Sequence, residues 1–186
     1  MLGVVRMRRK GFRWELIALS AVLTLAVLSL AYYSYENMGV KRPLERALML
    51  VTDVSAVQMR TEGGREVIEV TLSKVADLAT TYSRIHTLVS DRMGPGTFVL
   101  ELKDLRDESL DMMYHAVHYY LEEASVRGNF GTMIEACKPI LEEAGAVGYK
   151  ITVDQDRIYV QIDSAEGYLY QVLDRVPDKG TGGATQ

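Results

Sequence analysis

The sequence has few of the residues and none of the motifs on which most enzyme sites depend. Its single cysteine, Cys137, excludes a disulfide within the chain, and the apolar helical pattern around it predicts a buried, unreactive thiol. There is no Ser–His–Asp spacing, nucleophile elbow, glycine-rich phosphate loop, HExxH or CxxC sequence. We therefore expect a protein without catalytic activity and without a bound cofactor.

One stretch, residues 16–35, contains no charged residue. Its 20 residues would span about 30 Å as a helix, which is the thickness of a bilayer's hydrocarbon core. Trp14 and Tyr35 lie near its two ends, where amphipathic rings prefer the water–lipid boundary. Basic residues on the cytoplasmic side fix the orientation of such a helix, and five of them precede this one: Arg6, Arg8, Arg9, Lys10 and Arg13. The pattern predicts a single-pass signal-anchor helix in the cell membrane, with the N-terminus cytoplasmic and the C-terminal part extracytoplasmic.

A cleaved signal peptide is the alternative for this stretch. Ser29-Leu30-Ala31 offers the small residues that a signal peptidase requires after an apolar run. Against cleavage, the run continues through Ala31 into aromatic residues without a polar segment. Both readings place the rest of the chain outside the cytoplasm, and a domain that is stable there without disulfides suits a bacterial envelope.

The charge of the chain is acidic, with 21 basic and 25 acidic residues. Leaving out the five basic residues and Glu15 of the first 33 positions, 16 basic and 24 acidic residues remain. Nucleic acids and anionic lipid surfaces require a basic footprint. We therefore expect no nucleic-acid partner, and membrane contact only through residues 16–35.

After a short linker at 36–42, the first half of the remaining chain alternates helices and strands. Pro43 suits a first helical turn, and residues 44–51 have helical periodicity. Two alternating runs, 55–60 and 66–72, flank Gly63-Gly64 and predict a β-hairpin. Residues 74–93 form an amphipathic helix that we expect Ser73 to cap, and 97–102 reads as a strand. The order is helix–strand–strand–helix–strand (αββαβ) over 43–104.

The second half, 105–176, predicts two helices and three strands (ααβββ) with an antiparallel sheet. The helices cover 107–125 and 132–144, with a kink or a split at Pro139. The strands cover 149–153, 158–163 and 168–173, the first two joined by a turn at 154–157. Acidic residues at the start of the first helix, Asp104, Asp107, Glu108 and Asp111, are expected to cap it. Residues 177–186 read as a disordered tail. The fold class is therefore α+β, preceded by the basic segment 1–15 and the helix 16–35.

The element order of residues 43–102, with the sequence VTDVSAVQMR leading into the hairpin, resembles the ring-building motif. This small module occurs in membrane-anchored ring proteins of secretion and sporulation machines. The resemblance implies an αββαβ fold and a role in assembly. It rests on element order and includes no diagnostic residue.

A metal site is the main alternative to an interaction role. His115 and His118, with Asp111 and Glu122, share one face of the helix at 107–125, and these side chains suit Zn²⁺ or another divalent ion. Such a site would make the chain a metal-dependent enzyme or sensor. A solvated helix flank beside the core is the preferred reading of the same four residues.

Tyrosines are concentrated in the second half, and Tyr159, Tyr168 and Tyr170 fall on predicted strands. A large apolar ring with a polar tip suits contact with another protein, although sheet packing explains these residues as well. With no catalytic pattern, we expect an extracytoplasmic interaction or assembly protein whose partners are other membrane or envelope proteins, or a second copy of the chain. Exposed strand edges at 55–72 or 149–173 would supply its contact surface.

Overall fold

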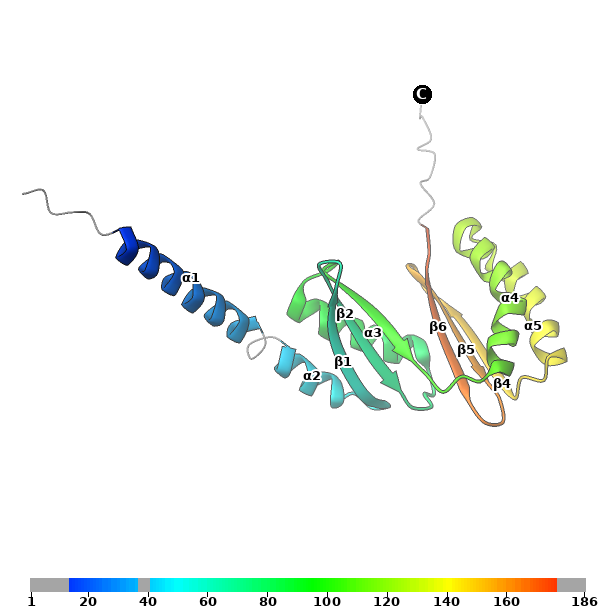
Figure 1. The fold of residues 1–186 in the computed structure, drawn as a ribbon. Helices are drawn as coiled ribbons and strands as arrows, with labels where there is room; N and C mark the ends of the chain where they lie inside the picture. Colours follow the sequence, from blue (N-terminus) through cyan, green and yellow to red (C-terminus); the bar gives the residue numbers. More distant parts are fainter. Residues whose placement is uncertain (1–13, 37–40, 177–186) are drawn as a thin grey trace, which may run out of the picture. The chain divides into compact units, whose positions relative to one another are not determined.

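The computed structural model describes residues 14–36 and 41–176 (Figure 1). Within these residues it contains five helices and six strands, the strands forming two three-stranded sheets. The predicted α+β class is therefore confirmed. Most of the basic segment, linker residues 37–40 and the tail at 177–186 lie outside the described residues.

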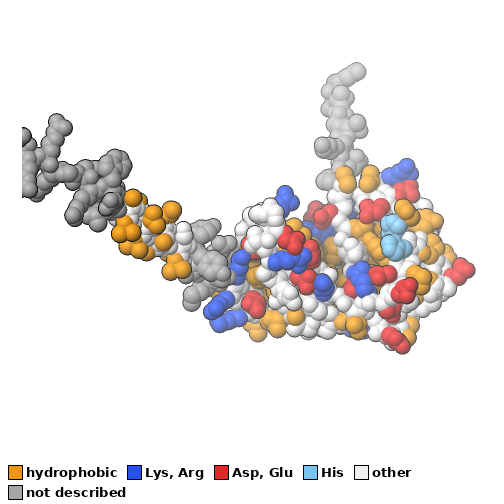
Figure 2. Space-filling model, in the orientation of Figure 1, with side chains coloured by type: hydrophobic (Ala, Val, Ile, Leu, Met, Phe, Trp, Pro, Cys, Tyr) orange, Lys and Arg blue, Asp and Glu red, His pale blue; other side chains and the backbone are white. Residues whose placement is uncertain are grey.

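The first helix, α1 (Trp14–Glu36), covers the uncharged stretch. Its side chains are described for residues 18–31, and each of these residues is exposed. Apolar side chains follow one another along this part of the helix (Figure 2). Within 14–36 and 41–176, no helix was found with both the length and the apolar character needed to cross a membrane.

The first sheet has the order β1-β2-β3, with β1 antiparallel and β3 parallel to β2. Ile68, Val70 and Leu72 alternate along β2 and turn one face of the sheet to an apolar core, where they meet Leu44 of α2 and Ile85 of α3. In chain order, the elements are α2 (Arg42–Met49), β1 (Val54–Glu62), β2 (Arg65–Leu72), α3 (Leu78–Met93) and β3 (Phe98–Lys103).

Helix α3 begins later than the sequence predicts, and Ser73 does not cap it. Asp77 occupies the N-cap position, while the hydroxyl of Ser73 donates a hydrogen bond to the carbonyl of Asp53 at 3.1 Å. Residues 73–77, which we call the crossover segment, are non-helical. Side chains from the second half of the chain form hydrogen bonds with the backbone of this segment. The sequence around residues 73–77 gives no sign of these distant contacts.

The second sheet has the order β4-β5-β6 and is antiparallel throughout. Ile158, Val160 and Ile162 of β5 face a second apolar core, closed by α4 and α5. Helix α5 runs unbroken through Pro139, which is exposed, so the chain is not split there. The elements are α4 (Glu108–Arg127), α5 (Phe130–Glu143), β4 (Gly148–Val153), β5 (Arg157–Asp163) and β6 (Tyr168–Asp174).

Cys137 of α5 lies in this second core, as predicted. Burial raises the pKa of its thiol to about 11, which keeps the thiolate scarce at neutral pH.

The other face of the second sheet packs against the first core. Tyr159 and Tyr170 are each 1% exposed, and both belong to the cluster that contains α2, α3 and β2. The side-chain amide of Gln161 donates to the carbonyl of Val75 at 2.8 Å. The described residues from Leu44 onward consequently belong to one compact unit rather than two separate ones.

Candidate functional site

Two strands, β3 and β6, each end a sheet and face one another. They meet at a single antiparallel bridge just beyond β3, where the amide of Tyr168 donates to the carbonyl of Leu105 at 2.9 Å. The residue before Tyr168 is glycine for a steric reason. A Cβ atom at Gly167 would collide with the backbone oxygen of Leu105. The bridge thus fixes one end of an arrangement in which two free sheet edges approach each other.

Beyond the bridge, the side chains of Asp104 and Arg106 take the place of a neighbouring strand. The amide of Tyr170 donates to Asp104 Oδ2 at 2.7 Å, and Arg106 Nη2 donates to the carbonyl of Tyr170 at 3.3 Å. The two side chains also bind each other bidentately, at 2.8 and 2.7 Å. These bonds to Asp104 raise the pKa of Arg106 above its ordinary value. Direct backbone pairing between the two edges is therefore limited to the Leu105–Tyr168 bridge.

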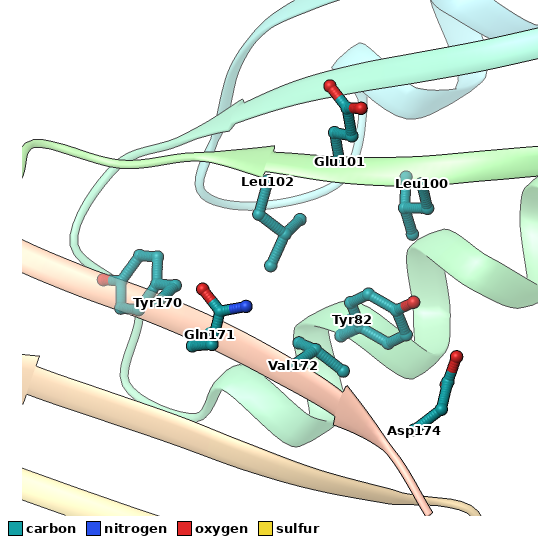
Figure 3. Close-up of a pocket in the computed structure, with 8 residues that line it drawn as sticks. All are labelled: Tyr82, Leu100, Glu101, Leu102, Tyr170, Gln171, Val172 and Asp174. Carbon is teal, nitrogen blue, oxygen red and sulfur yellow. The ribbon is translucent and has the colours of Figure 1, made fainter. Parts of the chain in front are cut away.

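Past Tyr170 the two edges leave a groove of about 330 Å³ between them (Figure 3). Leu100 and Leu102 of β3 point to the same side as the ring of Tyr82, whereas Glu101 points to the other side. Val172 lies opposite on β6. The lining of the groove is completed by Tyr170, Gln171 and Asp174. The groove therefore lies between two strand edges, and its lining combines aliphatic and aromatic side chains with polar groups.

The backbone of β6 turns hydrogen-bonding groups toward this groove. In an antiparallel pair, alternate residues point their amide and carbonyl away from the partner strand. Tyr168 and Tyr170 do so, as their bonds to Leu105, Asp104 and Arg106 demonstrate. The same alternation directs the backbone groups of Val172 outward, where no described residue pairs with them. Alternate residues of β3 face the groove from the other side, because β2 pairs with only one edge of that strand.

A charged cluster closes the far end of the groove, around a second hollow of about 330 Å³. Arg157 of β5 lies over the ring of Tyr82, 5.2 Å from its centroid, and pairs with Asp174 at 3.0 Å. Arg157 also lies 3.3 Å from Nε2 of His86. Since arginine can only donate, this nitrogen is the acceptor and the ring is neutral. Burial, followed by the charge of Arg157, lowers the pKa of His86.

The predicted metal ligands lie elsewhere, on α4. His115 and His118 have ring centroids 5.6 Å apart, and Nδ1 of His118 lies 2.8 Å from the carbonyl of His115. Asp111 pairs with Arg106 at 3.5 Å, while Glu122 is exposed. Across residues 14–36 and 41–176, no three or more His, Cys, Asp or Glu side chains are grouped so as to hold a metal ion.

The predicted interaction tyrosines make their contacts within the chain. The hydroxyl of Tyr170 accepts from the amide of Val75 at 2.8 Å, and that of Tyr168 donates to the carbonyl of Leu72 at 3.0 Å. The hydroxyl of Tyr159 donates to Asp154 at 2.7 Å. Tyr168 and Tyr170 therefore bind the strand end and crossover segment of the first sheet, and Tyr170 also lines the groove.

Four residues of the site have no clear signal in the sequence: His86, Asp104, Arg106 and Arg157. Asp104 belongs to the acidic cluster expected to cap α4, but only Asp107 does so, by accepting from the amide of Leu110 at 2.8 Å. His86, on α3, and Arg157, on β5, are 71 positions apart. Only the packing of α3 beneath both sheets brings them together.

No protein-family model matches this sequence, and no curated protein matches it significantly.

Proposed function

We propose that this chain is a membrane-anchored interaction or assembly protein without catalytic activity, whose folded part lies outside the cytoplasm. The observation that carries the proposal is the pair of free edges, β3 and β6, that flank a partly apolar groove. An unpaired edge offers backbone groups to a segment of another protein, and grooves beside such edges select its side chains. The partner is another membrane or envelope protein.

The anchor is residues 16–35. Helix α1 covers this stretch, and its described side chains are exposed on every side and apolar except for Ser20, Thr24 and Ser29. A helix without a polar face has no favourable surface to turn to water. Together with the basic residues before it, this supports a single-pass anchor with a cytoplasmic N-terminus.

The order α2–β1–β2–α3–β3 supports an assembly role, because it is the order on which the resemblance to the ring-building motif rests. Fold-level analogy has little weight for function. The groove is therefore the main support for this function. No observation on α4 favours the metal-dependent alternative.

The proposal is tested by photo-crosslinking in intact cells. A photoreactive amino acid at Gln171, in the groove, should capture a defined protein from the envelope fraction. The same amino acid at Glu135, exposed on α5, is the matched control and should capture none.

A double variant, His115→Gln with His118→Gln, should leave capture at Gln171 unchanged. Equal capture from both positions would argue against a specific contact surface. Loss of capture in the double variant, together with loss of one bound metal ion per folded chain, would favour the metal site instead.

A further inference from the structure

The two sheets lie over the same helix, and no described strand pairs with both β3 and β6. Tyr82 of α3 belongs to the first core, lines the groove and contacts Tyr159 of the second sheet, with ring centroids 5.7 Å apart. At the bridge, β3 and β6 are close enough to pair directly. Neighbouring strands lie about 4.8 Å apart, so an inserted strand requires twice that spacing between the edges.

The side chains of Asp104 and Arg106 bind the edge of β6 at Tyr170. A carboxylate and a guanidinium occupy the pairing positions at Tyr170, where the backbone of β3 would otherwise be. Past this point, no backbone hydrogen bond between described residues joins the two edges. The next outward-facing position on β6, Val172, therefore lies beside an open groove.

An extended segment in the groove would have two distinct faces. On one face its side chains would meet Leu100, Leu102 and Tyr82, which are apolar or aromatic. On the other face they would lie beside Glu101. Since successive side chains of a strand alternate between faces, the segment would alternate apolar residues with residues that suit Glu101.

The charge beside Glu101 favours a basic residue at those alternate positions. Arg60 is shared by three carboxylates, those of Glu62 at 2.8 Å, Glu69 at 3.1 Å and Glu101 at 2.8 Å. Lys103 contributes only to Glu69, at 3.5 Å. Across the three strands this face therefore has three carboxylates, Glu62, Glu69 and Glu101, against the two cations Arg60 and Lys103. A lysine or arginine of the incoming segment would balance the remaining negative charge.

The described strands of this chain do not supply the occupant. The amides of Arg175 and Val176 donate to the carbonyls of Asp156 and Ser125, so residues 175 and 176 turn from β6 toward α4. In a second copy, each described strand is already paired on at least one side. None of them could pair with both β3 and β6.

Resting on the proposed function, we propose that the groove binds one extended segment of a different protein, in which apolar residues alternate with lysine or arginine. The segment pairs with β3 on one side and with Val172 of β6 on the other. The result is a seven-stranded sheet in the order β1-β2-β3-segment-β6-β5-β4.

The test selects binders from a phage library of random linear heptapeptides, with the full chain in detergent micelles as the target. Affinities of the selected peptides are then measured against three variants. Val172→Pro removes the groove-facing amide and spares the bonds to β5. Val153→Pro makes the same change at the opposite free edge, on β4, and is the matched control. Val172→Arg keeps the amide but fills the groove, so the test does not depend on one variant that fails to fold.

We expect the selected peptides to alternate apolar and basic residues. Their affinity should fall at least about tenfold for Val172→Pro and for Val172→Arg, and by less than about twofold for Val153→Pro. Amide exchange at Val172 should slow when the peptide is bound. Peptides that bind equally to all variants would overturn this inference while leaving an interaction role intact. If no peptide is selected although crosslinking at Gln171 succeeds in cells, the partner is not an extended segment, and the inference is likewise overturned.

Discussion

At the scale of single residues, the long-range contacts of the crossover segment are made by a few polar side chains. Tyr170 and Gln161 bind backbone groups of Val75 and Leu78 in a buried environment. Burial raises the pKa of Tyr170 to about 12, so its hydroxyl remains a neutral donor and acceptor. The sequence identified Tyr170 as notable, but its partner lies 95 positions away and no local pattern links them.

We expect Tyr170→Phe to lower the free energy of unfolding by about 1–3 kcal/mol, because it leaves the buried amide of Val75 without its acceptor. Urea denaturation followed by circular dichroism measures this. Tyr119→Phe is the control. That ring is 75% exposed, and the change should stay within about 0.5 kcal/mol. Equal effects of the two substitutions would contradict the role assigned to Tyr170.

His86 should make stability depend on pH. It faces Arg157 of β5, Asp174 of β6 and Phe98 of β3, and burial and Arg157 lower its pKa. The unfolded chain then binds a proton more readily than the folded chain. The free energy of unfolding should fall as the pH is lowered through about 6.5, the ordinary histidine value.

Urea denaturation at pH values from about 5 to about 8, on either side of the ordinary histidine pKa, measures the effect. His86→Gln should flatten the slope in that interval. An unchanged slope would assign the pH dependence to another group.

At the scale of elements, hydrophobic periodicity was sufficient to predict the hairpins and their faces. Ile68 and Val70 point inward, and so do Val160 and Ile162, as their alternation predicts. One prediction failed at a helix start: the start of α3 was misplaced because distant side chains hold the crossover segment. At Pro139, where a kink or a split was expected, α5 is not split. The groove could not be predicted, since it depends on where two separate sheets end.

We expect Pro139→Ala to raise the free energy of unfolding by about 1–3 kcal/mol. Proline has no amide to donate to the carbonyl of Glu135 and crowds the preceding turn, whereas alanine restores the bond in an exposed helix position. Thermal and urea denaturation measure the gain. Lys138→Ala, at the exposed neighbour, should change stability by less than about 0.5 kcal/mol. A loss of stability in Pro139→Ala would mean that the proline contributes packing.

At the scale of the whole molecule, one tether and one groove define the proposed mode of action. Confinement to a membrane surface raises the effective concentration of a binding site, so a short strand contact of modest affinity is sufficient. The acidity of the chain after residue 33 is consistent with a basic partner segment.

The topology has its own test. A C-terminal fusion to an enzyme that is active only outside the cytoplasm should be active in whole cells, and the chain should stay with membranes in alkaline carbonate. Replacing Arg6, Arg8, Arg9, Lys10 and Arg13 with glutamate should reduce the correctly oriented fraction, because basic residues fix orientation. Activity of a cytoplasm-only reporter at the C-terminus would contradict the proposed placement.

The crossover segment also has a consequence for biosynthesis. The ribosome makes the chain from its N-terminus, so β1, β2 and α3 exist before the residues that bind the segment between them. The amides of Val75 and Leu78 receive their acceptors only when Tyr170 and Gln161 have been synthesised, 95 and 83 positions later. A ribosome stalled before codon 161 would hold a nascent chain whose first sheet lacks its final contacts. Folding of this unit therefore completes after translation has nearly ended, rather than sheet by sheet.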